Sequence, residues 1–423
     1  MMKIIDLNNW FYSLSSEWQE ILKRNIFNWT IDEESKIMNK NYTLTEAELC
    51  EIYYLETLST VIPDPFGSEG YTPNIDYNVL KDLKFLKYLD LSNGAEFNIF
   101  PILENIKYLR CKFNNLNDLD FLQYFPSLRS LDCSCNPVHN IKDVFDLKLS
   151  EFFIDNNEEI NEDLIEYKRR NPKCNFISAQ SGINLSSFDS ICNFIRVNRK
   201  EKFNIFQKEI YERGIEYLVH FTPTINLFSI LENQELMSRA KLESLDIEQF
   251  DILDYVRFTD DFRYDNKNYI NLSLSGPNKF LFSRFRQKTK DDFTINWCVL
   301  KIDPKHIYDK NSLFSVTNAA SNAAKRQFGI SGDIRKFKML FEEQLNINTS
   351  KGVRPLTRKS VHPKYPTDVQ AEILVRDTIP SESIMEVCFE SEEKLAEAKA
   401  AMSAFDTSNF VVDKEIFSPN RSK

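Results

Sequence analysis

Three polar side chains in the fragment YLVHFTPTINLFSIL have the types and the spacing of a ligand-binding group. His220 and Thr222 lie two residues apart, which places them on one face of a predicted strand, and Asn226 comes near the start of the next predicted helix. Their donors and acceptors can hydrogen-bond ribose hydroxyls and a carboxamide. A histidine on an apolar strand is also an ordinary hydrogen-bonded core residue, so this fragment alone leaves both interpretations open.

A carboxylate in an apolar strand is the second candidate. In YPTDVQAEILVRDTI, Gln370 and Glu372 alternate into a strand that begins just after a Pro-containing loop. A carboxylate at the mouth of a buried strand is costly unless it is hydrogen-bonded, so such a residue usually has a purpose. The same residues also fit a structural Glu372 that pairs with a lysine or an arginine.

Two further fragments carry polar residues with chemical potential. In DDFRYDNKNYINLSLSGPN, Arg263 stands among three carboxylates ahead of a predicted strand, and Asn278 follows that strand. A surface ion-pair cluster would have the same composition. In TNAASNAAKRQ, Asn318, Ser321 and Asn322 are interleaved with alanines, which also fits a capped helix start.

These fragments lie on a series of short predicted elements. We expect strands in IEYLVHFT, NYINLSLS, INWCVLKID and AEILVRD, and a helix in INLFSILENQEL. The stretch SAQSGINLSS has the composition of a linker, and FDSICNFIRVNRKEKFNIFQKEIYERG predicts a helix that ends at Gly214. The second half is therefore predicted to be mixed α/β or α+β.

The first half carries an internal repeat. Between Leu86 and Leu164 the apolar residues recur on a template of about 20–22 residues, L-x-x-L-x-L-x-x-N-x-L, which is the leucine-rich repeat pattern. The aligned positions are Leu86, Leu89 and Leu91; Ile106, Leu109, Cys111 and Asn114; Leu128, Leu131, Cys133 and Asn136; and Leu149, Phe152, Ile154 and Asn157. Each repeat predicts one short strand, with Cys111 and Cys133 as small inward hydrophobes and the Asn bonding the backbone at the turn.

The flanks of this array predict capping helices. SLSSEWQEILKRNIF and TLTEAELCEIYYLETL have helical spacing with Ser and Thr as N-caps, and DLIEYKRRNP predicts a last helix stopped by Pro172. The predicted fold class is thus multidomain: a leucine-rich repeat solenoid with a helical N-terminal cap, then an α+β domain. A repeat array of this size is usually a binding surface, so we expect it to serve recognition.

Size and composition fit this organisation. The chain has 423 residues, 42% of them apolar, which suits two domains with their own cores. The start MMKIIDLNNWFYSL has no secretory signal pattern and no run approaches 18 apolar residues, so we expect a cytoplasmic protein without a membrane span. The eight cysteines are scattered apart from the C-x-C of Cys133 and Cys135, which supports neither a zinc site nor a disulfide framework.

The formal net charge of −10 is divided unevenly. Residues 1–180 hold 18 Lys and Arg against 29 Asp and Glu, a net of −11, whereas residues 281–364 hold 17 against 7, a net of +10. The basic segment should attract polyanions, although a solvated basic face is the plainer explanation. Its cations include Arg284, Arg286, Lys288, Lys325, Arg326, Lys336, Lys338, Arg354 and Arg358. The phenylalanines among them, Phe280, Phe282 and Phe285, are expected in the core.

Taken together and in order, the fragments of the second half resemble the DarT family of ADP-ribosyltransferases, toxins of bacterial toxin–antitoxin systems that modify bases of single-stranded DNA. The resemblance covers about 175 residues, from Tyr217 to Phe389. The matching pieces are HFT followed by NL, the D-x-x-R-x-D around Arg263, NLSLSGPN, TNAASNAA, and QAEILV. The repeats lie outside the usual family domain, and related transferase folds also modify RNA or protein.

The resemblance implies a set of roles. NAD would be consumed as a substrate and no metal would be needed, since cleavage of its nicotinamide–ribose bond passes through an oxocarbenium-like state that a carboxylate stabilises. The catalytic residues would be Glu372, holding the ribose 2′-hydroxyl, and Arg263, near the phosphates or the incoming base. His220, Thr222 and Asn226 would bind NAD. The expected nucleic-acid contacts are Asn278, Arg284, Arg286, Asn318, Asn322, Lys325 and Arg326.

The expected organisation and partners follow. We predict a helical cap at 1–80, repeats at 81–180, a helical connector at 181–214, the transferase domain at 215–390, and a C-terminal helix and tail at 391–423. The expected acceptor is single-stranded DNA or another nucleic acid, and an antitoxin or a phage-derived protein would bind the repeats. RNA or a protein delivered by the repeats is the alternative target, and a scaffold that binds NAD-like ligands without turnover is the non-enzymatic one.

Overall fold

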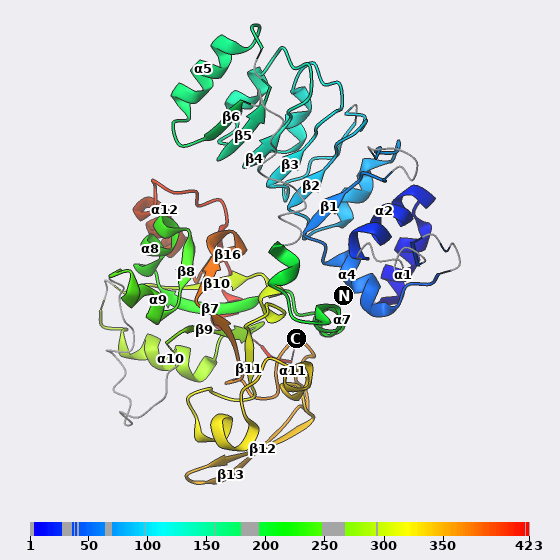
Figure 1. Cartoon of the computed structure of the whole chain (residues 1–423). Coiled ribbons are helices and arrows are strands. Elements are labelled where there is room, and N and C mark those ends of the chain that lie inside the picture. The colour runs from blue at the N-terminus through cyan, green and yellow to red at the C-terminus, as the bar shows by residue number, and fades with distance from the viewer. Residues whose placement is uncertain are drawn as a thin grey trace. The chain divides into compact units, whose positions relative to one another are not determined.

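A computed structural model describes residues 4–27, 36–37, 39, 42–63, 70–97, 99–155, 157–178, 194–247, 267–292, 295–418 and 420–422. The chain divides into two compact units, Met1–Val197 and Asn198–Lys423, which are described separately below (Figure 1). Each unit has its own sheet and its own buried apolar residues.

The N-terminal unit begins with helices whose starts the sequence marks. They are α1 (Ile4–Ser13), α2 (Ser16–Ile26) and α4 (Glu46–Tyr53). The Ser15 side chain accepts the Trp18 amide at the start of α2, and Thr45 and Glu48 form a capping box at the start of α4. Both predicted N-caps are therefore confirmed.

Six short strands follow and form one parallel sheet in chain order (Figure 1). They are β1 (Thr57–Ser59), β2 (Tyr88–Asp90), β3 (Tyr108–Arg110), β4 (Ser130–Asp132), β5 (Glu151–Ile154) and β6 (Asn175–Ser178). The starts of β2 to β5 are 20, 22 and 21 residues apart, the period of the sequence template. The apolar template positions, Cys111 and Cys133 included, are buried.

Most of the connections between these strands contain short helices. They are the 3₁₀-helices Tyr77–Asp82, Asp120–Tyr124 and Lys142–Asp146, and the helix α5 (Asn161–Arg170) just before Pro172. The template asparagines close the turns as predicted. Asn136 Nδ2 donates to the carbonyls of Cys111 and Cys133, both at 2.9 Å, and its Oδ1 accepts the Asn114 amide at 2.8 Å. One side chain thus joins two neighbouring repeats.

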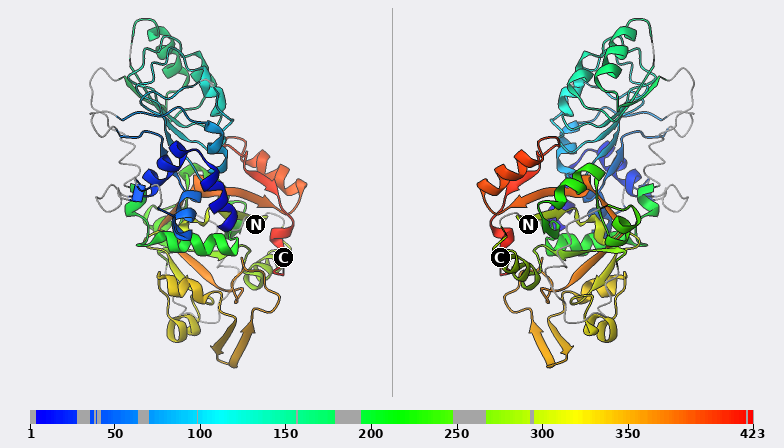
Figure 2. Two further views of the ribbon diagram at one scale, coloured as in Figure 1. Left: turned by 90° about the vertical axis from the view of Figure 1, so that its right-hand side faces the viewer. Right: turned by 90° about the vertical axis from the view of Figure 1, so that its left-hand side faces the viewer.

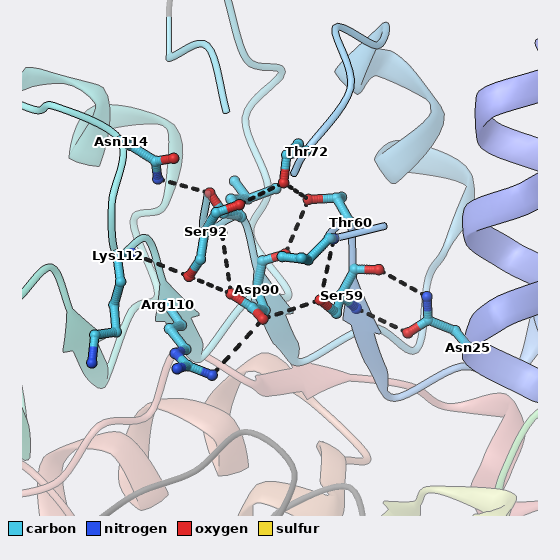
Figure 3. A network of polar contacts seen from close by, with 11 residues as sticks. Asn25, Ser59, Thr60, Thr72, Asp90, Ser92, Arg110, Lys112 and Asn114 are labelled. Carbon is cyan, nitrogen blue, oxygen red and sulfur yellow. Dashed lines mark hydrogen bonds and ion pairs between the residues drawn. The ribbon is translucent and has the colours of Figure 1, made fainter. Parts of the chain in front are cut away.

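A polar network fastens the N-terminal helices to the first strands (Figure 3). Asn25, on α2, donates to the Ser59 carbonyl at 2.8 Å and accepts the Ser59 amide at 2.9 Å. The Ser59 hydroxyl donates to the buried Asp90 carboxylate on β2, which also accepts the Ser92 hydroxyl and lies 4.0 Å from Arg110 on β3. These hydrogen bonds attach helix α2 to β1, the first strand of the sheet.

The C-terminal unit is an α+β fold around a seven-stranded sheet of order β11-β14-β9-β7-β10-β16-β17. The strands are β7 (Leu218–Pro223), β9 (Tyr269–Leu274), β10 (Trp297–Ile302), β11 (Leu313–Ser315), β14 (Glu372–Arg376), β16 (Ile384–Phe389) and β17 (Phe410–Val412). All neighbouring pairs are antiparallel except β16 with β17. Two small pairs, β8 (Glu235–Met237) with β15 (Thr378–Pro380) and β12 (Gln344–Thr349) with β13 (Gly352–Thr357), stand apart from it.

Helices and turns flank this sheet. They are α7 (Phe203–Arg213), α8 (Asn226–Asn233), α9 (Arg239–Ser244), α10 (Lys279–Lys288), α11 (Ile334–Met339), α12 (Glu392–Ala401), a π-helix (Ala323–Phe328) and the 3₁₀-helices Pro304–Ile307, Ser381–Ser383 and Glu415–Phe417. Phe282 and Phe285 of α10 pack with Val219 and Trp297 in the core. These two phenylalanines are buried as expected, whereas Phe280 is 58% exposed.

Two segments differ from the sequence expectation. The helix predicted to end at Gly214 does end there, with Gly214 at φ 65°, but α7 begins at Phe203. Residues 194–197 of the predicted segment are also helical, 198–202 interrupt the helix, and the part before 194 lies outside the described residues. Lys202 has φ 55°, and Arg199 forms a β-bridge with Asp309 instead of continuing the helix. The segment 391–423, expected as a helix and a tail, also supplies β17, which pairs with β16.

The asparagine ladder gives the first prediction. Asn136→Ala should destabilise the N-terminal unit by about 2–4 kcal/mol, because it leaves several buried backbone groups without their partner. Hydrogen–deuterium exchange of the full chain should show faster exchange at the amides of Asn114 and Leu116, which bond Asn136 Oδ1. The exposed Asn117→Ala is the control and should leave both amides protected.

Candidate active site

Glu372 is the first residue of β14, where the chain leaves the loop before that strand and enters the sheet. The side chain is only 7% exposed. On either side of it, Ala371 and Ile373 are buried and apolar. The sequence therefore places a carboxyl group at the point where a polar loop meets an apolar strand, as predicted.

The carboxyl group is held by hydrogen-bond donors and not by a cation. The Ala319 amide N–H donates to Glu372 Oε2 at 2.7 Å, and the Asn271 side chain also bonds it. Among the described residues its partners include no lysine or arginine, so none of these residues forms the structural ion pair that the sequence left open. The pKa of Glu372 is raised to about 7, mainly by burial and to a smaller extent by the nearby Asp368, while the two hydrogen bonds act in the opposite direction.

His220 lies on β7 just beyond the last residue that pairs with β9. The strands β7 and β9 pair only at Leu218 with Leu274 and at Val219 with Ser273. The next residue along β7 is His220, whose Nδ1 lies 3.3 Å from the carbonyl oxygen of Asn271 on β9. The imidazole ring therefore contacts a carbonyl group at the point where strand pairing ends.

This contact defines the chemical state of the ring. A carbonyl oxygen only accepts, so Nδ1 carries the hydrogen and Nε2 remains an acceptor for a ligand hydroxyl. Burial lowers the pKa of His220, and the contact with the Asn271 carbonyl only partly offsets this, so the ring is neutral at pH 7. Because Asn271 touches the His220 ring through its carbonyl and Glu372 through its side chain, the two predicted residues share one neighbour.

Thr222 and Asn226 form a buried polar pair beside this point. The Asn226 amide nitrogen, at the start of α8, donates to Thr222 Oγ1 at 3.0 Å, and both side chains are buried. Thr222 lies on the same side of β7 as His220, opposite Val219 and Phe221, which pack toward α10. The three residues predicted to bind NAD are thus brought together on one strand and the adjoining helix.

Ser275 is a strained residue at the end of β9 that the sequence reasoning did not single out. It adopts φ 56°, a conformation that is rare for residues other than glycine, and it is 2% exposed. Within the described part of the chain its buried hydroxyl has no hydrogen-bond partner. Strain and an unused hydroxyl near a strand end are features that cluster at ligand sites.

The other residues predicted to act in catalysis or to contact nucleic acid differ in exposure and in their hydrogen bonds. Arg263 lies outside the described residues. Asn278 caps α10, accepting the Leu281 amide at 3.3 Å, and is 4% exposed, so its side chain is structural. Asn318 accepts the Ala320 amide at 3.0 Å in the turn that bonds Glu372, and Asn322 is exposed at the start of the π-helix.

The basic segment is less available than its composition suggests. Arg284 and Arg326 are exposed and Lys325 is half-buried, but Arg286 pairs with Glu390 at 2.6 Å. The three further cations Lys338, Arg354 and Arg358 are engaged by Glu209, by Asp368 and by backbone carbonyls, respectively. Arg358 is only 8% exposed. The expectation that Arg358 helps to attract polyanions is therefore wrong, because its buried guanidinium donates to carbonyls and does not reach solvent.

The residues that the prediction missed are those that surround Glu372. Asn271 is the first residue of NLSLSGPN and Ala319 lies within TNAASNAA, so both stand in fragments that were recognised as motifs. Their contacts with Glu372 depend on the pairing of β9 and β14 and on a backbone amide, and no residue type signals a backbone amide. Asp368, four residues before Glu372, was also missed. It is 1% exposed, and this burial is visible only in the structure.

No group of three or more His, Cys, Asp or Glu side chains has the arrangement of a metal site in the described segments. No described helix has the length and apolar character needed to cross a membrane.

Comparison with known proteins defines the class of this site. Residues 219–418 match the model of the family described as ssDNA thymidine ADP-ribosyltransferase, DarT. The C-terminal unit is therefore an NAD-dependent ADP-ribosyltransferase domain, and the chain carries a member of the DarT family in this unit. The match runs past Phe389 to residue 418 and so includes β17, which pairs with β16.

Several solved structures resemble the same region. Thermus sp. 2.9 DarT in complex with carba-NAD+ is 12% identical, with a TM-score of 0.33, over 48% of this chain and 97% of that chain. The same enzyme with ADP-ribosylated ssDNA is 11% identical, with a TM-score of 0.32, over 48% and 96%. Thermosipho africanus DarTG with ADP-ribose is 17% identical, with a TM-score of 0.32, over 48% of this chain and 51% of that chain. The family match, and not these similarities, carries the assignment.

One curated relative matches a short part of the chain. The mouse (Mus musculus) leucine-rich repeat and WD repeat-containing protein 1 is 36% identical over 87 residues. The aligned stretch makes up 20% of this chain and only 13% of the mouse protein.

The raised pKa of Glu372 predicts a pH-dependent stability. The folded state favours the protonated form, so its contribution to stability is present below the unfolded pKa of 4.5 and is lost as the pH rises through about 7. Glu372→Gln keeps an acceptor for Ala319 and removes the buried charge. It should stabilise the C-terminal unit by up to about 3 kcal/mol at pH 8 and by almost nothing at pH 4.5.

Thermal unfolding of the full chain from pH 4.5 to pH 8 measures this difference. The exposed Glu382→Gln provides the matched control and should show no such trend. A Glu372→Gln curve parallel to that of the wild type at every pH would contradict the buried charge.

Proposed function

We propose that this protein transfers ADP-ribose from NAD to a thymine base of single-stranded DNA, with Glu372 as the catalytic carboxylate. The observation that carries the proposal is a buried carboxyl group with a pKa of about 7, inside a DarT family match, that shares its neighbour Asn271 with the neutral His220. The thymidine acceptor follows the description of the family.

Bond cleavage requires stabilisation of a cation. When the bond between the ribose C1′ and the nicotinamide nitrogen breaks, its electron pair leaves with the neutral nicotinamide and positive charge develops on the ribose. The ionised Glu372 carboxylate would accept a hydrogen bond from the ribose 2′-hydroxyl and stabilise that charge, an effect that is large in a water-poor site. The Ala319 amide and the Asn271 side chain would hold the carboxylate in place for this contact.

Transfer requires an acceptor nitrogen with a removable proton. In thymidine the ring nitrogen N1 is bonded to deoxyribose, so N3 is the ring N–H. Its lone pair would form the new bond to C1′, and its proton would pass to Glu372 and then to solvent. A carboxyl group with a pKa of about 7 is suited to taking and releasing a proton near neutral pH.

The remaining residues would hold the substrates. His220 Nε2 would accept a ribose hydroxyl, and the Thr222–Asn226 pair would bind the NAD carboxamide or ribose. Arg263 is proposed near the phosphates or the incoming base. The exposed Arg284 and Arg326 would contact the phosphates of the DNA strand, and Asn318, Asn322, Lys325 and Arg286 would line its path.

We propose that the N-terminal unit is a leucine-rich repeat solenoid that recognises a regulator. Its parallel sheet with a period of 20–22 residues and its asparagine ladder support this assignment, together with the mouse relative. The regulator would be an antitoxin or a phage-derived protein, and the protein would act in the cytoplasm as a toxin or anti-phage effector. In this division 1–80 is the cap, 81–180 the repeats, 181–214 the connector, and the transferase begins at 215.

Incubation of the full chain with labelled NAD and a thymidine-containing single strand tests the activity. We expect label on the oligonucleotide that survives protease and is lost with nuclease, and a rate that rises with pH through about 7 as Glu372 ionises. Glu372→Ala should lower kcat by about 10³-fold, since it removes the group that stabilises the cation.

The acceptor controls separate the alternatives. An oligonucleotide without thymine should stay unlabelled. Label on lysate protein or on RNA alone would support the alternative targets, and equal NAD cleavage by the wild type and Glu372→Ala would rule out the mechanism.

Expression in a bacterial host tests the toxin role. The full-length wild type should slow growth and cause DNA damage, whereas Glu372→Ala, made at the same level, should not. The matched variant Glu382→Gln should be as toxic as the wild type, because Glu382 is exposed. Equal growth of all three strains, with activity present in vitro, would contradict the toxin role in this host. A host factor would then inhibit the enzyme, or the enzyme would have a role other than that of a toxin.

A further inference from the structure

The β12–β13 hairpin contacts both segments that surround the Glu372 carboxyl group. Its two strands pair over six residue pairs, from Gln344 with Thr357 to Thr349 with Gly352. In Figure 2 the hairpin projects away from the rest of the C-terminal unit. Leu345 and Ile347 are buried on one side of the hairpin.

The first contact runs through Gln327 at the end of the π-helix. Its Nε2 donates to the Asn346 carbonyl at 2.6 Å, and its Oε1 accepts the Asn348 amide at 2.9 Å. One side chain thus takes the place of a strand partner for β12. The π-helix follows the turn whose Ala319 amide bonds Glu372, so β12 is connected to one donor of the carboxyl group.

The second contact runs through an ion pair. Arg354 on β13 donates to Asp368 Oδ2 at 2.7 Å. The other oxygen, Asp368 Oδ1, accepts the Gln370 amide at 3.0 Å and so shapes the two residues before Glu372. Asp368 is 1% exposed, and a carboxylate buried to this degree depends on its cation.

The base of the hairpin is fastened to the same loop. Thr367 donates its hydroxyl to the Glu342 carbonyl at 2.6 Å and its amide to the Leu340 carbonyl at 2.8 Å. Arg358, just after β13, donates to the Tyr365 carbonyl at 2.7 Å. A continuous series of contacts therefore runs from Ala319 through the π-helix, β12, β13 and Asp368 to the residues just before Glu372.

We propose that the β12–β13 hairpin is the positioning element of the Glu372 carboxyl group, with Asp368, held by Arg354, as its positioning residue. This inference rests on the proposed function, because it assigns a catalytic consequence to the position of Glu372. A carboxylate that must face the ribose C1′ tolerates little displacement, and a shift of about 1 Å can cost about 10²-fold in rate.

Four full-length proteins test this role: the wild type, Arg354→Gln, Asp368→Asn and the double variant. Arg354→Gln should lower kcat about 10²-fold with the KM for NAD almost unchanged, and it should lower the thermal midpoint because Asp368 loses its cation. The double variant should regain the midpoint, since the buried charge is gone, while kcat stays low because the hairpin is still detached.

Two independent readouts separate positioning from general damage. In the part of the chain that the structure describes, the polar neighbours of Glu372 are the Ala319 amide, Asn271 and Asp368. Asp368→Asn removes a like charge and should move the acidic limb of the kcat profile to lower pH, whereas Arg354→Gln should move it to higher pH. Gln327→Leu, which changes no charge, should lower kcat with the acidic limb unmoved. Arg335→Gln, whose side chain is 93% exposed, is the control and should change nothing.

Hydrogen exchange at the Ala319 amide decides the inference even without activity. That amide is protected by Glu372, so its exchange should speed up in Arg354→Gln and in the double variant. Unchanged exchange, or a double variant that regains kcat together with its midpoint, would overturn the positioning role. If the wild type labels no DNA, but exchange at the Ala319 amide still speeds up in the variants, only the proposed function is contradicted.

Discussion

The site depends on one unfavourable burial that is only partly offset. Glu372 loses water at the start of β14, and its partners within the described segments are the Ala319 amide and the Asn271 side chain, neither of which carries a charge. A cation in their place would have held the carboxyl group ionised and structural. Neutral donors instead leave its pKa near 7, so the same burial that costs stability keeps the group able to bind a cation or exchange a proton.

The second feature that shapes the site is the short pairing between β7 and β9 in the sheet. The strands β7 and β9 share two residue pairs, whereas β7 and β10 share six. Where the short ladder stops, His220 contacts the Asn271 carbonyl, and Asn271 bonds Glu372 from the same strand. The short pairing thus leaves the Asn271 carbonyl free to contact the His220 ring and not a backbone amide of β7.

The arginines of the C-terminal unit show that charge composition and charge function differ. Arg354 and Arg358 belong to the most basic part of the chain, yet one pairs with buried Asp368 and the other donates to carbonyls of the loop before Glu372. They stabilise the loop that carries the carboxylate. The N-terminal unit uses the same principle, since Asp90 is buried among the hydroxyls of Ser59 and Ser92 and lies near Arg110 (Figure 3).

The sequence by itself determined the elements that local pattern controls. A repeat period of 20–22 residues placed strands β2 to β5, Ser15 and Thr45 began their helices, and the alternation around His220 and Glu372 placed both on strands. Tertiary structure alone decided which groups meet: Asn271 and Ala319 reach Glu372 through the β9–β14 register and a backbone amide, and Arg358 is withdrawn from solvent. The reason is physical, because periodicity and capping act over a few residues, whereas strand register and burial are set by contacts between residues that are far apart in the chain.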